Sequence, residues 1–313
     1  MQIIQETTEF RLPGKSAVAM GKFDGIHLGH QKLLERITEQ KKRGLLAAVF
    51  TFSPSPEAFF TGKEVKSLMS VDEKRAAFEK AGVDVLIEFP MNKKTAATEP
   101  QRFVEEYLAG KMQAAFIVAG TDVSFGREGA GDAGLLQRMA KDFGYHVEII
   151  DKVRIDKEDV SSTLVREALV SGDMPKVNIL LGAPYRIEGV VSHGRAFGRT
   201  LGMPTVNLPP SGEKLLPPNG VYYSCAWLED KRYPAISNIG YKPTVSNEQA
   251  LGVETYLYDF AQDIYGSKIA VELLDFKRPE MKFESVGALK AQMQRDIEEG
   301  AVFHQWRFPE KKN

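Results

Sequence analysis

Two histidines and three glycines make residues 21–30 the first candidate for chemistry. The segment reads Gly-Lys-Phe-Asp-Gly-Ile-His-Leu-Gly-His, so His27 and His30 lie three residues apart. On a helix, side chains at this spacing face one ligand. An apolar run at 17–20 precedes the segment and a helical pattern follows it, which predicts a turn between a strand and a helix. Because a helix N-terminus presents free N–H groups, this turn suits phosphate.

These histidines could instead be plain surface residues or metal ligands. Zinc is disfavoured, because the only cysteine, Cys225, is distant and no third ligand is nearby. Gly21, Gly25 and Gly29 let the backbone turn tightly and approach a substrate. Together with the preceding strand, the glycines favour a substrate site.

A second anion-binding candidate is the segment 160–166, which contains Ser162, Thr163 and Arg166. Hydroxyl side chains at a helix start cap free N–H groups, and this segment could be a plain helix cap. The same N–H groups can hold a phosphate instead. Arg166 lies within one turn of Ser162, so its guanidinium can reach the same anion.

The elements that would position these residues follow from the periodicity of the first half. Apolar runs at 17–20, 45–52, 83–89, 114–119 and 146–150 alternate with helical patterns at about 30–43, 72–81, 100–110 and 132–143. This alternation predicts a mostly parallel sheet, in which ligands bind at the carboxyl ends of the strands. The loops 21–30, 51–54 and 120–126 should therefore open onto one crevice. A stiff Ser-Pro loop at 53–56 and a flexible surface loop at 120–131 are the alternatives.

The second half has a different pattern, with short strands and Gly/Pro turns from about residue 184. Thr205 and Asn207 are two residues apart, so on a strand they share a face, and their oxygens are hard ligands suited to Mg²⁺. Glu254 shares a face with Tyr256 and Tyr258 and is a candidate general base, although an exposed strand residue is the commoner case. A helix at 284–299 has an apolar stripe of Val286, Leu289, Met293 and Ile297.

Composition excludes several classes of protein. The 313 residues carry 41 basic and 42 acidic side chains, a net charge of -1, so no nucleic-acid partner is expected. A single cysteine is typical of proteins in the reducing cytoplasm. The polar N-terminus does not have the pattern of a signal peptide, and no apolar run is long enough to span a membrane. We therefore expect a cytoplasmic protein without a membrane partner, and a weak homo-oligomer is possible.

These motifs together resemble a known family. His27-Leu28-Gly29-His30 with the segment 161–166 is similar to the adenylyltransferase half of the bacterial bifunctional riboflavin kinase/FMN adenylyltransferase family, also called FAD synthetase. The run 194–208, with its Pro-Thr-Val-Asn, and the segment 238–245 resemble the kinase half. The resemblance implies a Rossmann-like nucleotidyltransferase domain with a parallel sheet at 1–183. At 184–313 it implies a six-stranded antiparallel β-barrel with a C-terminal helix.

The resemblance also implies roles for individual residues. The catalytic set would be His27, His30, Ser162, Thr163, Arg166 and Glu254, and Thr205 and Asn207 would bind Mg²⁺. Substrates and products would be contacted by Gly21, Phe23, Asp24, Gly29, Asp122, Phe125, Gly126 and Arg127 in the first domain, and by Gly194, Arg195, Gly198, Arg199, Gly202, Pro204 and Asn238 in the second. ATP, riboflavin, FMN and FAD would be the small molecules involved.

The sequence leaves three further functions open. The chain could retain FAD synthesis alone, or its His-x-Gly-His domain could act on a different phosphorylated acceptor. A flavin-binding regulator without catalysis is the third. Separate assays of FMN and FAD formation, with a screen of acceptors, distinguish them.

Overall fold

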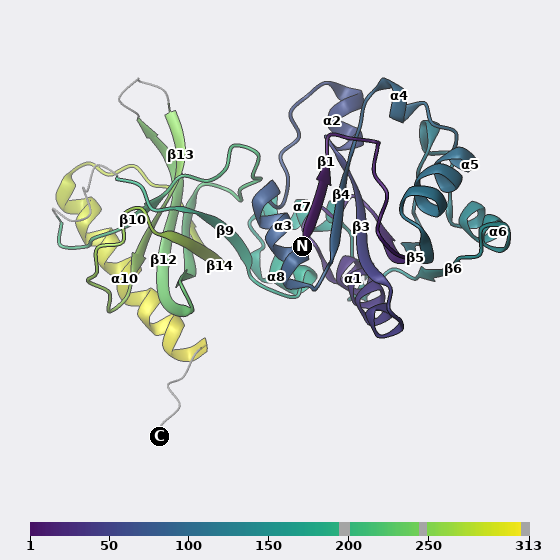
Figure 1. The fold of residues 1–313 in the computed structure, drawn as a ribbon. Coiled ribbons are helices and arrows are strands. Elements are labelled where there is room, and N and C mark those ends of the chain that lie inside the picture. The colour runs from purple at the N-terminus through teal and green to yellow at the C-terminus, as the bar shows by residue number, and fades with distance from the viewer. Residues whose placement is uncertain (194–200, 244–248, 308–313) are drawn as a thin grey trace. The chain divides into compact units, whose positions relative to one another are not determined.

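A computed structural model describes residues 1–193, 201–243 and 249–307. Figure 1 draws its two compact units, Met1–Ser162 and Thr163–Asn313. Four of the expected ligand-binding residues, Gly194, Arg195, Gly198 and Arg199, lie outside the described residues. The domain boundary after residue 183 stays a prediction.

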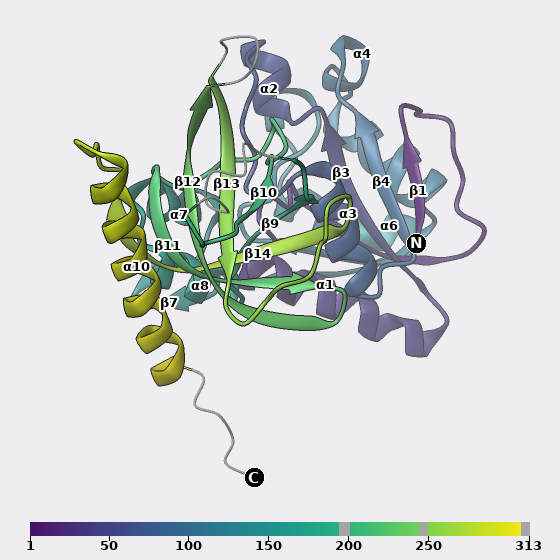
Figure 2. The same ribbon diagram turned by 90° about the vertical axis from the view of Figure 1, so that its left-hand side faces the viewer.

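A six-stranded parallel sheet forms the centre of the first unit. Its strands are β1 (Gln2–Gln5), β2 (Ser16–Met20), β3 (Leu46–Ser53), β4 (Val85–Pro90), β5 (Ala114–Gly120) and β6 (His146–Ile150), in the spatial order β1-β4-β3-β2-β5-β6. Five strands match the expected runs, which confirms the parallel sheet. The edge strand β1, beside β4 in Figure 2, was not expected from the sequence. It is short, begins and ends with glutamine and is mostly exposed, so it has no apolar signal.

Helices cover the sheet and create two apolar layers. The longer ones are α1 (Leu28–Glu39), continued by a 3₁₀ turn (Gln40–Arg43), α3 (Val71–Lys80), α5 (Pro100–Arg102), continued by a π-helix (Phe103–Lys111), and α6 (Ala133–Phe143). Short elements are α2 (Pro56–Thr61), α4 (Lys93–Ala96), a 3₁₀ turn (Arg127–Gly129) and the hairpin β7 (Arg154–Ile155) and β8 (Glu158–Asp159). One layer contains Phe50, Phe89 and Phe103, and the other contains Leu34 and Phe78. Strands buried on both faces explain the continuous apolar runs in the sequence.

The order of the strands fixes where ligands can bind. The strand β2 lies between β3 and β5, so the chain leaves β2 in one direction and returns on its other side at β5. A crevice forms at such a switch point, outside the carboxyl ends of the strands. The turn 21–30 follows β2 and the loop 120–131 follows β5, so both lie at this crevice.

An antiparallel sheet of six strands forms the second unit. Its strands are β9 (Tyr185–Val190), β10 (Val206–Leu208), β11 (Gly220–Leu228), β12 (Lys231–Pro243), β13 (Gln249–Leu257) and β14 (Lys268–Pro279), in the order β10-β13-β12-β11-β14-β9. A bridge between Ser192 and Asn207 joins the two ends, with the Ser192 N–H donating to the Asn207 carbonyl at 2.9 Å. The expected six-stranded barrel is thereby confirmed. Helices α7 (Ser162–Ser171) and α8 (Met174–Leu181) precede it.

Three hydroxyl groups cross the interior of the barrel. Ser237 lies 2.8 Å from Ser224 and 2.8 Å from Thr255, measured between side-chain oxygens, and all three residues are buried. Ala226, Ala235 and Leu257 form an apolar cluster of the same barrel. The sole cysteine, Cys225, is also buried in β11, with 1% of its surface exposed. Hydroxyl groups so buried must satisfy one another, which ties β11, β12 and β13 together.

The C-terminal helix α10 (Val286–Arg307) is longer than expected and packs through its second half. The Tyr258 hydroxyl donates to the Ile297 carbonyl at 2.6 Å, and the Phe303 ring stacks on Tyr223 with centroids 4.2 Å apart. The expectation that Val286 lies in a packed stripe is wrong, because 56% of its surface is exposed. No described helix is long and apolar enough to cross a membrane.

Candidate active sites

The two histidines stack at the start of α1. His27 is the N-cap residue, and its Nδ1 accepts a hydrogen bond from the His30 N–H at 3.4 Å. The two ring centroids are 3.8 Å apart, with 20° between the planes. A nitrogen that accepts a hydrogen bond carries no proton, so the proton of a neutral His27 is on Nε2. Nε2–H is then a donor that can bind a phosphate oxygen.

Gly29 makes this stacking possible. A Cβ at position 29 would lie 3.1 Å from Cε1 and 3.2 Å from Nδ1 of His27, closer than ordinary van der Waals contact. At the start of the turn, a Cβ on Gly21 would lie 3.2 Å from the ring of Phe23. The glycines of the motif therefore leave room for rings that fold back over the backbone, in addition to any approach by a ligand.

Phe23 packs against His30. Its side chain is fully buried, and its ring lies 4.9 Å from the His30 ring and 5.3 Å from that of Phe78, measured between centroids. Both Phe23 and Ile26 have positive φ, 50° and 41°, a conformation that non-glycine residues rarely adopt. The turn therefore holds strained backbone directly beside the histidines, as functional sites commonly do.

Burial keeps both imidazoles neutral. It lowers the pKa of His27 to about 4, although the nearby carboxylates of Asp122 and Asp24 act in the opposite direction. Burial, with a smaller contribution from His27, also holds the pKa of His30 well below its ordinary value. At neutral pH the pair therefore offers hydrogen-bond donors rather than full positive charges.

Asp24 connects the histidine turn to two other segments. Its carboxylate accepts a hydrogen bond from the Leu68 N–H at 2.8 Å, and its carbonyl accepts one from the Ser162 hydroxyl at 2.8 Å. The structure thus brings Ser162, one of the expected site residues, to the histidine turn. Thr163 and Arg166 follow it in the first turns of α7.

The loop after β5 places its expected residues in different environments. Asp122 is mostly exposed and pairs with Lys152 at 3.2 Å. Phe125 is buried in the core. Gly126 has a φ of 71°, and a Cβ there would lie 2.8 Å from Pro100. Arg127 pairs with the Glu99 carboxylate at 2.7 Å. Asp122 therefore faces the crevice, while the next residues fix the loop.

The barrel lines up three polar residues on neighbouring strands. Asn207 of β10 is directly opposite Glu254 of β13, and Glu254 is directly opposite Asn238 of β12. Residues that face each other across antiparallel strands point to the same side of the sheet. Asn207, Glu254 and Asn238 therefore form one row on the face opposite to the buried hydroxyls. Because the resemblance assigns Asn207 and Glu254 to riboflavin phosphorylation, we call it the kinase row.

The remaining expected residues of the barrel lie next to the kinase row in sequence. Thr205 is half-buried and immediately precedes β10, Pro204 is exposed, and Gly202 has a φ of 82°. Within residues 1–193, 201–243 and 249–307, no group of three or more His, Cys, Asp or Glu side chains could hold a metal ion. The hydroxyl, amide and carboxylate oxygens of Thr205, Asn207 and Glu254 are instead the hard donors that suit Mg²⁺ bound together with a nucleotide.

Two charged residues near these sites were not expected from the sequence. Lys152 follows β6 and meets Asp122 at the crevice; the parallel-sheet rule could have found it, because β6 ends at the same edge as β5. Glu280 follows β14 and lies against Gly240, two residues beyond Asn238. Only the register of the strands could have indicated Glu280.

Comparison with known proteins assigns each half of the chain to a described family model. Residues 10–164 match the FAD synthetase model and residues 181–303 match the riboflavin kinase model. The bifunctional riboflavin kinase/FMN adenylyltransferase of Listeria monocytogenes is 35% identical over 289 residues, which cover 91% of each chain. That of Escherichia coli K12 is 36% identical over 282 residues, covering 89% of this chain and 90% of the other.

A solved structure has the same fold over nearly the whole length. It is described as a macrolide-efflux protein from Streptococcus pneumoniae, is 32% identical, and superposes with a TM-score of 0.83 over 96% of this chain and 98% of the other. The alignments to the two curated relatives span about nine-tenths of this chain and therefore reach into both units. The chain therefore belongs to the bifunctional riboflavin kinase/FMN adenylyltransferase family.

Proposed function

We propose that the chain makes FAD from riboflavin in two ATP-dependent steps, one in each half. The barrel transfers the γ-phosphoryl group of ATP to the 5′-hydroxyl of riboflavin, which gives FMN. The first unit transfers AMP from ATP to FMN, which gives FAD and pyrophosphate. The observation that carries the proposal is that each half contains its own set of donors, the histidine pair in one and the kinase row in the other.

For adenylyl transfer, a phosphate oxygen of FMN attacks the α-phosphorus of ATP and the bond to the bridging oxygen of pyrophosphate breaks. We assign His27 and His30 to hold the ATP phosphates, which is supported by the Nε2–H left free to donate on His27. Ser162, Thr163 and Arg166 would neutralise the charge that develops on pyrophosphate. Gly21, Asp24, Gly29 and Asp122 would shape the pocket, while Phe23, Phe125, Gly126 and Arg127 would support it.

For phosphoryl transfer, Glu254 would accept the proton of the riboflavin hydroxyl as its oxygen attacks the γ-phosphorus, and the bond from that phosphorus to the bridging oxygen breaks to release ADP. Thr205 and Asn207 would hold Mg²⁺, which neutralises the phosphate charge when it is bound with ATP. Asn238 would orient the Glu254 carboxylate, which is supported by their direct opposition across β12 and β13. We assign ATP binding to six residues that precede β10 in the sequence, namely Gly194, Arg195, Gly198, Arg199, Gly202 and Pro204.

A time course separates the two activities. The chain is mixed with ATP and Mg²⁺, and with riboflavin in one tube and FMN in another, and the flavins are followed by chromatography. We expect FMN and then FAD in the first tube and FAD in the second, and EDTA should stop both. FAD formed only from FMN would contradict the kinase half of the proposal.

Single substitutions then test the assigned residues. His30→Ala should lower FAD formation by roughly 10²-fold or more, the scale of losing one transition-state partner, and leave FMN formation intact. Glu254→Ala should do the converse. Parental FAD synthesis in the first variant, or parental riboflavin phosphorylation in the second, would remove that assignment.

We further propose that the chain is a cytoplasmic protein and at most a weak homo-oligomer. Its small net charge and single cysteine support the location. Sedimentation at several concentrations tests the oligomeric state, and a stable oligomer whose mass does not change with concentration would contradict this proposal.

A further inference from the structure

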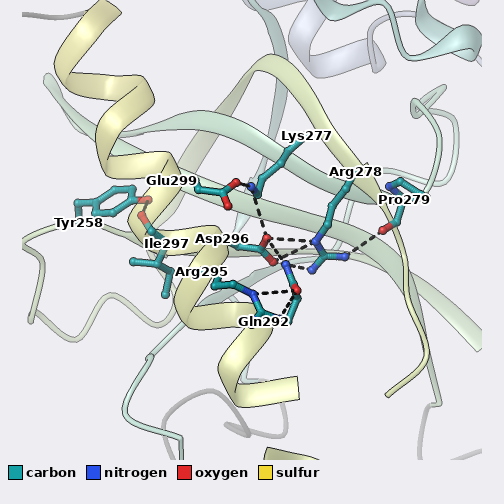
Figure 3. Close-up of polar contacts among 9 residues, drawn as sticks. All are labelled: Tyr258, Lys277, Arg278, Pro279, Gln292, Arg295, Asp296, Ile297 and Glu299. Carbon is teal, nitrogen blue, oxygen red and sulfur yellow. Dashed lines mark hydrogen bonds and ion pairs between the residues drawn. The ribbon is translucent and has the colours of Figure 1, made fainter. Parts of the chain in front are cut away.

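A buried group of charges attaches α10 to the end of β14. The Arg278 guanidinium forks onto the Asp296 carboxylate, with Nε 3.1 Å from both oxygens and Nη2 2.5 Å from Oδ2 (Figure 3). Gln292 donates to the same carboxylate at 3.0 Å, and the Lys277 ammonium lies 3.6 Å from it. Only 5% of the Asp296 side chain is exposed. The Lys277 ammonium also pairs with Glu299.

A bulge in β14 makes this arrangement possible. Tyr222 is opposite Phe276 and Val221 is opposite Arg278, so Lys277 is an extra residue in β14. Successive residues of a regular strand point to opposite faces. The bulge re-aims one of them, so that both Lys277 and Arg278 reach α10. Two adjacent cations thus meet one buried carboxylate.

Arg278 lies on the same face of the sheet as the kinase row. Along the register, Asn238 is opposite Val221 and Val221 is opposite Arg278. The third arm of the guanidinium, Nη1, donates to the carbonyl of Pro279 at 2.9 Å, as Figure 3 shows. Arg278 therefore fixes the start of the turn that leaves β14.

That turn carries Glu280 to the kinase row. A Cβ built on Gly240 would overlap the Glu280 carboxylate and would lie 3.4 Å from Asn238 Nδ2. The Glu280 carboxylate therefore fills the space over Gly240, beside Asn238, which is itself opposite Glu254. Contacts thus join Asp296 to Arg278 and Arg278 to the Pro279 carbonyl, and Glu280, the next residue, occupies the space over Gly240 at the end of the kinase row.

We propose that Asp296 is a positioning residue for riboflavin phosphorylation: by fixing Arg278 it sets the turn after β14 and holds the Glu280 carboxylate beside Asn238. Asp296 touches no reacting atom in this scheme and acts only through other residues. The inference rests on the proposed role of the kinase row. Small displacements of groups around a reacting centre lower the rate steeply, so loss of the clamp should reduce kcat.

Asp296→Asn is the first test, because it keeps the size of the side chain and removes its charge. Well below the variant's own Tm, we expect kcat for FMN formation to fall by about tenfold, with the KM for ATP changed by less than twofold. Arg278→Lys, which keeps the charge and loses the fork, should give an intermediate loss. FAD formation from FMN in the same preparations should stay at the parental rate.

Gly240→Ala tests the same path without touching the charge cluster. The new methyl group displaces the Glu280 carboxylate, so kcat for FMN formation should again fall, even if Asp296→Asn does not fold. Glu298→Gln is the matched control: it removes an exposed acid from the same helix and should leave both activities unchanged.

The outcomes separate this inference from the proposed function. Parental kcat in folded Asp296→Asn, or in Gly240→Ala, would overturn the positioning role. A loss of activity that is only proportional to the fraction of unfolded protein would also overturn the positioning role, because that is the result expected of a structural residue. A parent chain that forms no FMN would instead overturn the kinase function, and the inference with it.

Discussion

At the scale of single residues, the histidine pair combines burial with hydrogen bonding. The imidazoles are held neutral, and the one tautomer that allows His27 to cap α1 leaves its Nε2–H as a donor. A neutral donor can bind phosphate without the strong charge attraction that would slow release of pyrophosphate. This balance suits the role proposed for the histidine pair, in which the site binds and releases polyanions in every cycle.

Burial of these histidines predicts a loss of stability in acid. The pKa of His27 falls to about 4 on folding, so between pH 6.5 and 4 the unfolded chain binds more protons than the folded one. The stabilisation is complete above pH 6.5 and is lost as pH falls, by about 2 kcal/mol at pH 5 for one such group. Urea unfolding at pH 7 and 5 measures it. His27→Gln should reduce the pH dependence of the unfolding free energy, and the exposed His146→Gln should not. An equal change in unfolding free energy between pH 7 and 5 in the parent and both variants would contradict this account.

Gly29→Ala should lower FAD formation by about tenfold or more, because the methyl group pushes the His27 ring out of its stack. FMN formation is the internal control and should not change. The measurement is the rate of FAD formation from FMN and ATP, with Gly14→Ala as a matched substitution at a glycine whose Cβ would meet nothing within 4 Å. Parental FAD formation in Gly29→Ala would show that the stacking is dispensable.

At the scale of elements, the sequence predicted most strands and helices and missed those without an apolar pattern. The four inner strands of the parallel sheet, β4, β3, β2 and β5, are continuous apolar runs because both of their faces are buried. The edge strand β1 has no such run. The helix α10 was expected to pack by a stripe that includes Val286, yet it is attached by Tyr258, Asp296 and Phe303. Contacts made by aromatic rings and charged side chains do not produce a periodic pattern of apolar residues in the sequence.

Register explains which parts of the sites could be predicted. His27 and His30 are close in sequence, so their spacing indicates a shared ligand. Asn207, Glu254 and Asn238 lie on three strands, and only the pairing of those strands makes them one row. The alternation of side chains along a strand predicts which face of the sheet each residue is on. It does not predict which residues of the other strands lie beside it. The extra residue in β14, on which the Asp296 clamp depends, is equally invisible in the sequence.

The buried hydroxyls predict that Ser237→Ala destabilises the barrel. The Ser237 side chain contacts both Ser224 and Thr255, so its removal leaves two buried hydroxyls without this partner, at a cost of about 1–3 kcal/mol. Thermal unfolding of the variant, compared with the exposed Ser211→Ala, measures the effect. An unchanged Tm would mean that the two remaining hydroxyls find other acceptors.

At the scale of the whole molecule, each half contains the groups assigned to its own reaction. A mixture of His30→Ala and Glu254→Ala chains should therefore convert riboflavin to FAD, although neither variant does so efficiently alone. FMN made by the first variant would diffuse to the intact site of the second. Chromatography of the mixture measures this, and the absence of FAD would show that FMN must pass between the two halves of one chain.

The buried cysteine gives this chain a built-in chemical reporter. Cys225 is the only thiol in 313 residues, and 1% of its surface is exposed within β11. A thiol reagent can modify it only when the barrel opens, whereas opening of the first unit exposes no thiol at all. The labelling rate of the unmodified protein therefore measures the opening of the kinase half alone, and its slowing by riboflavin or ATP would report binding there without an engineered probe.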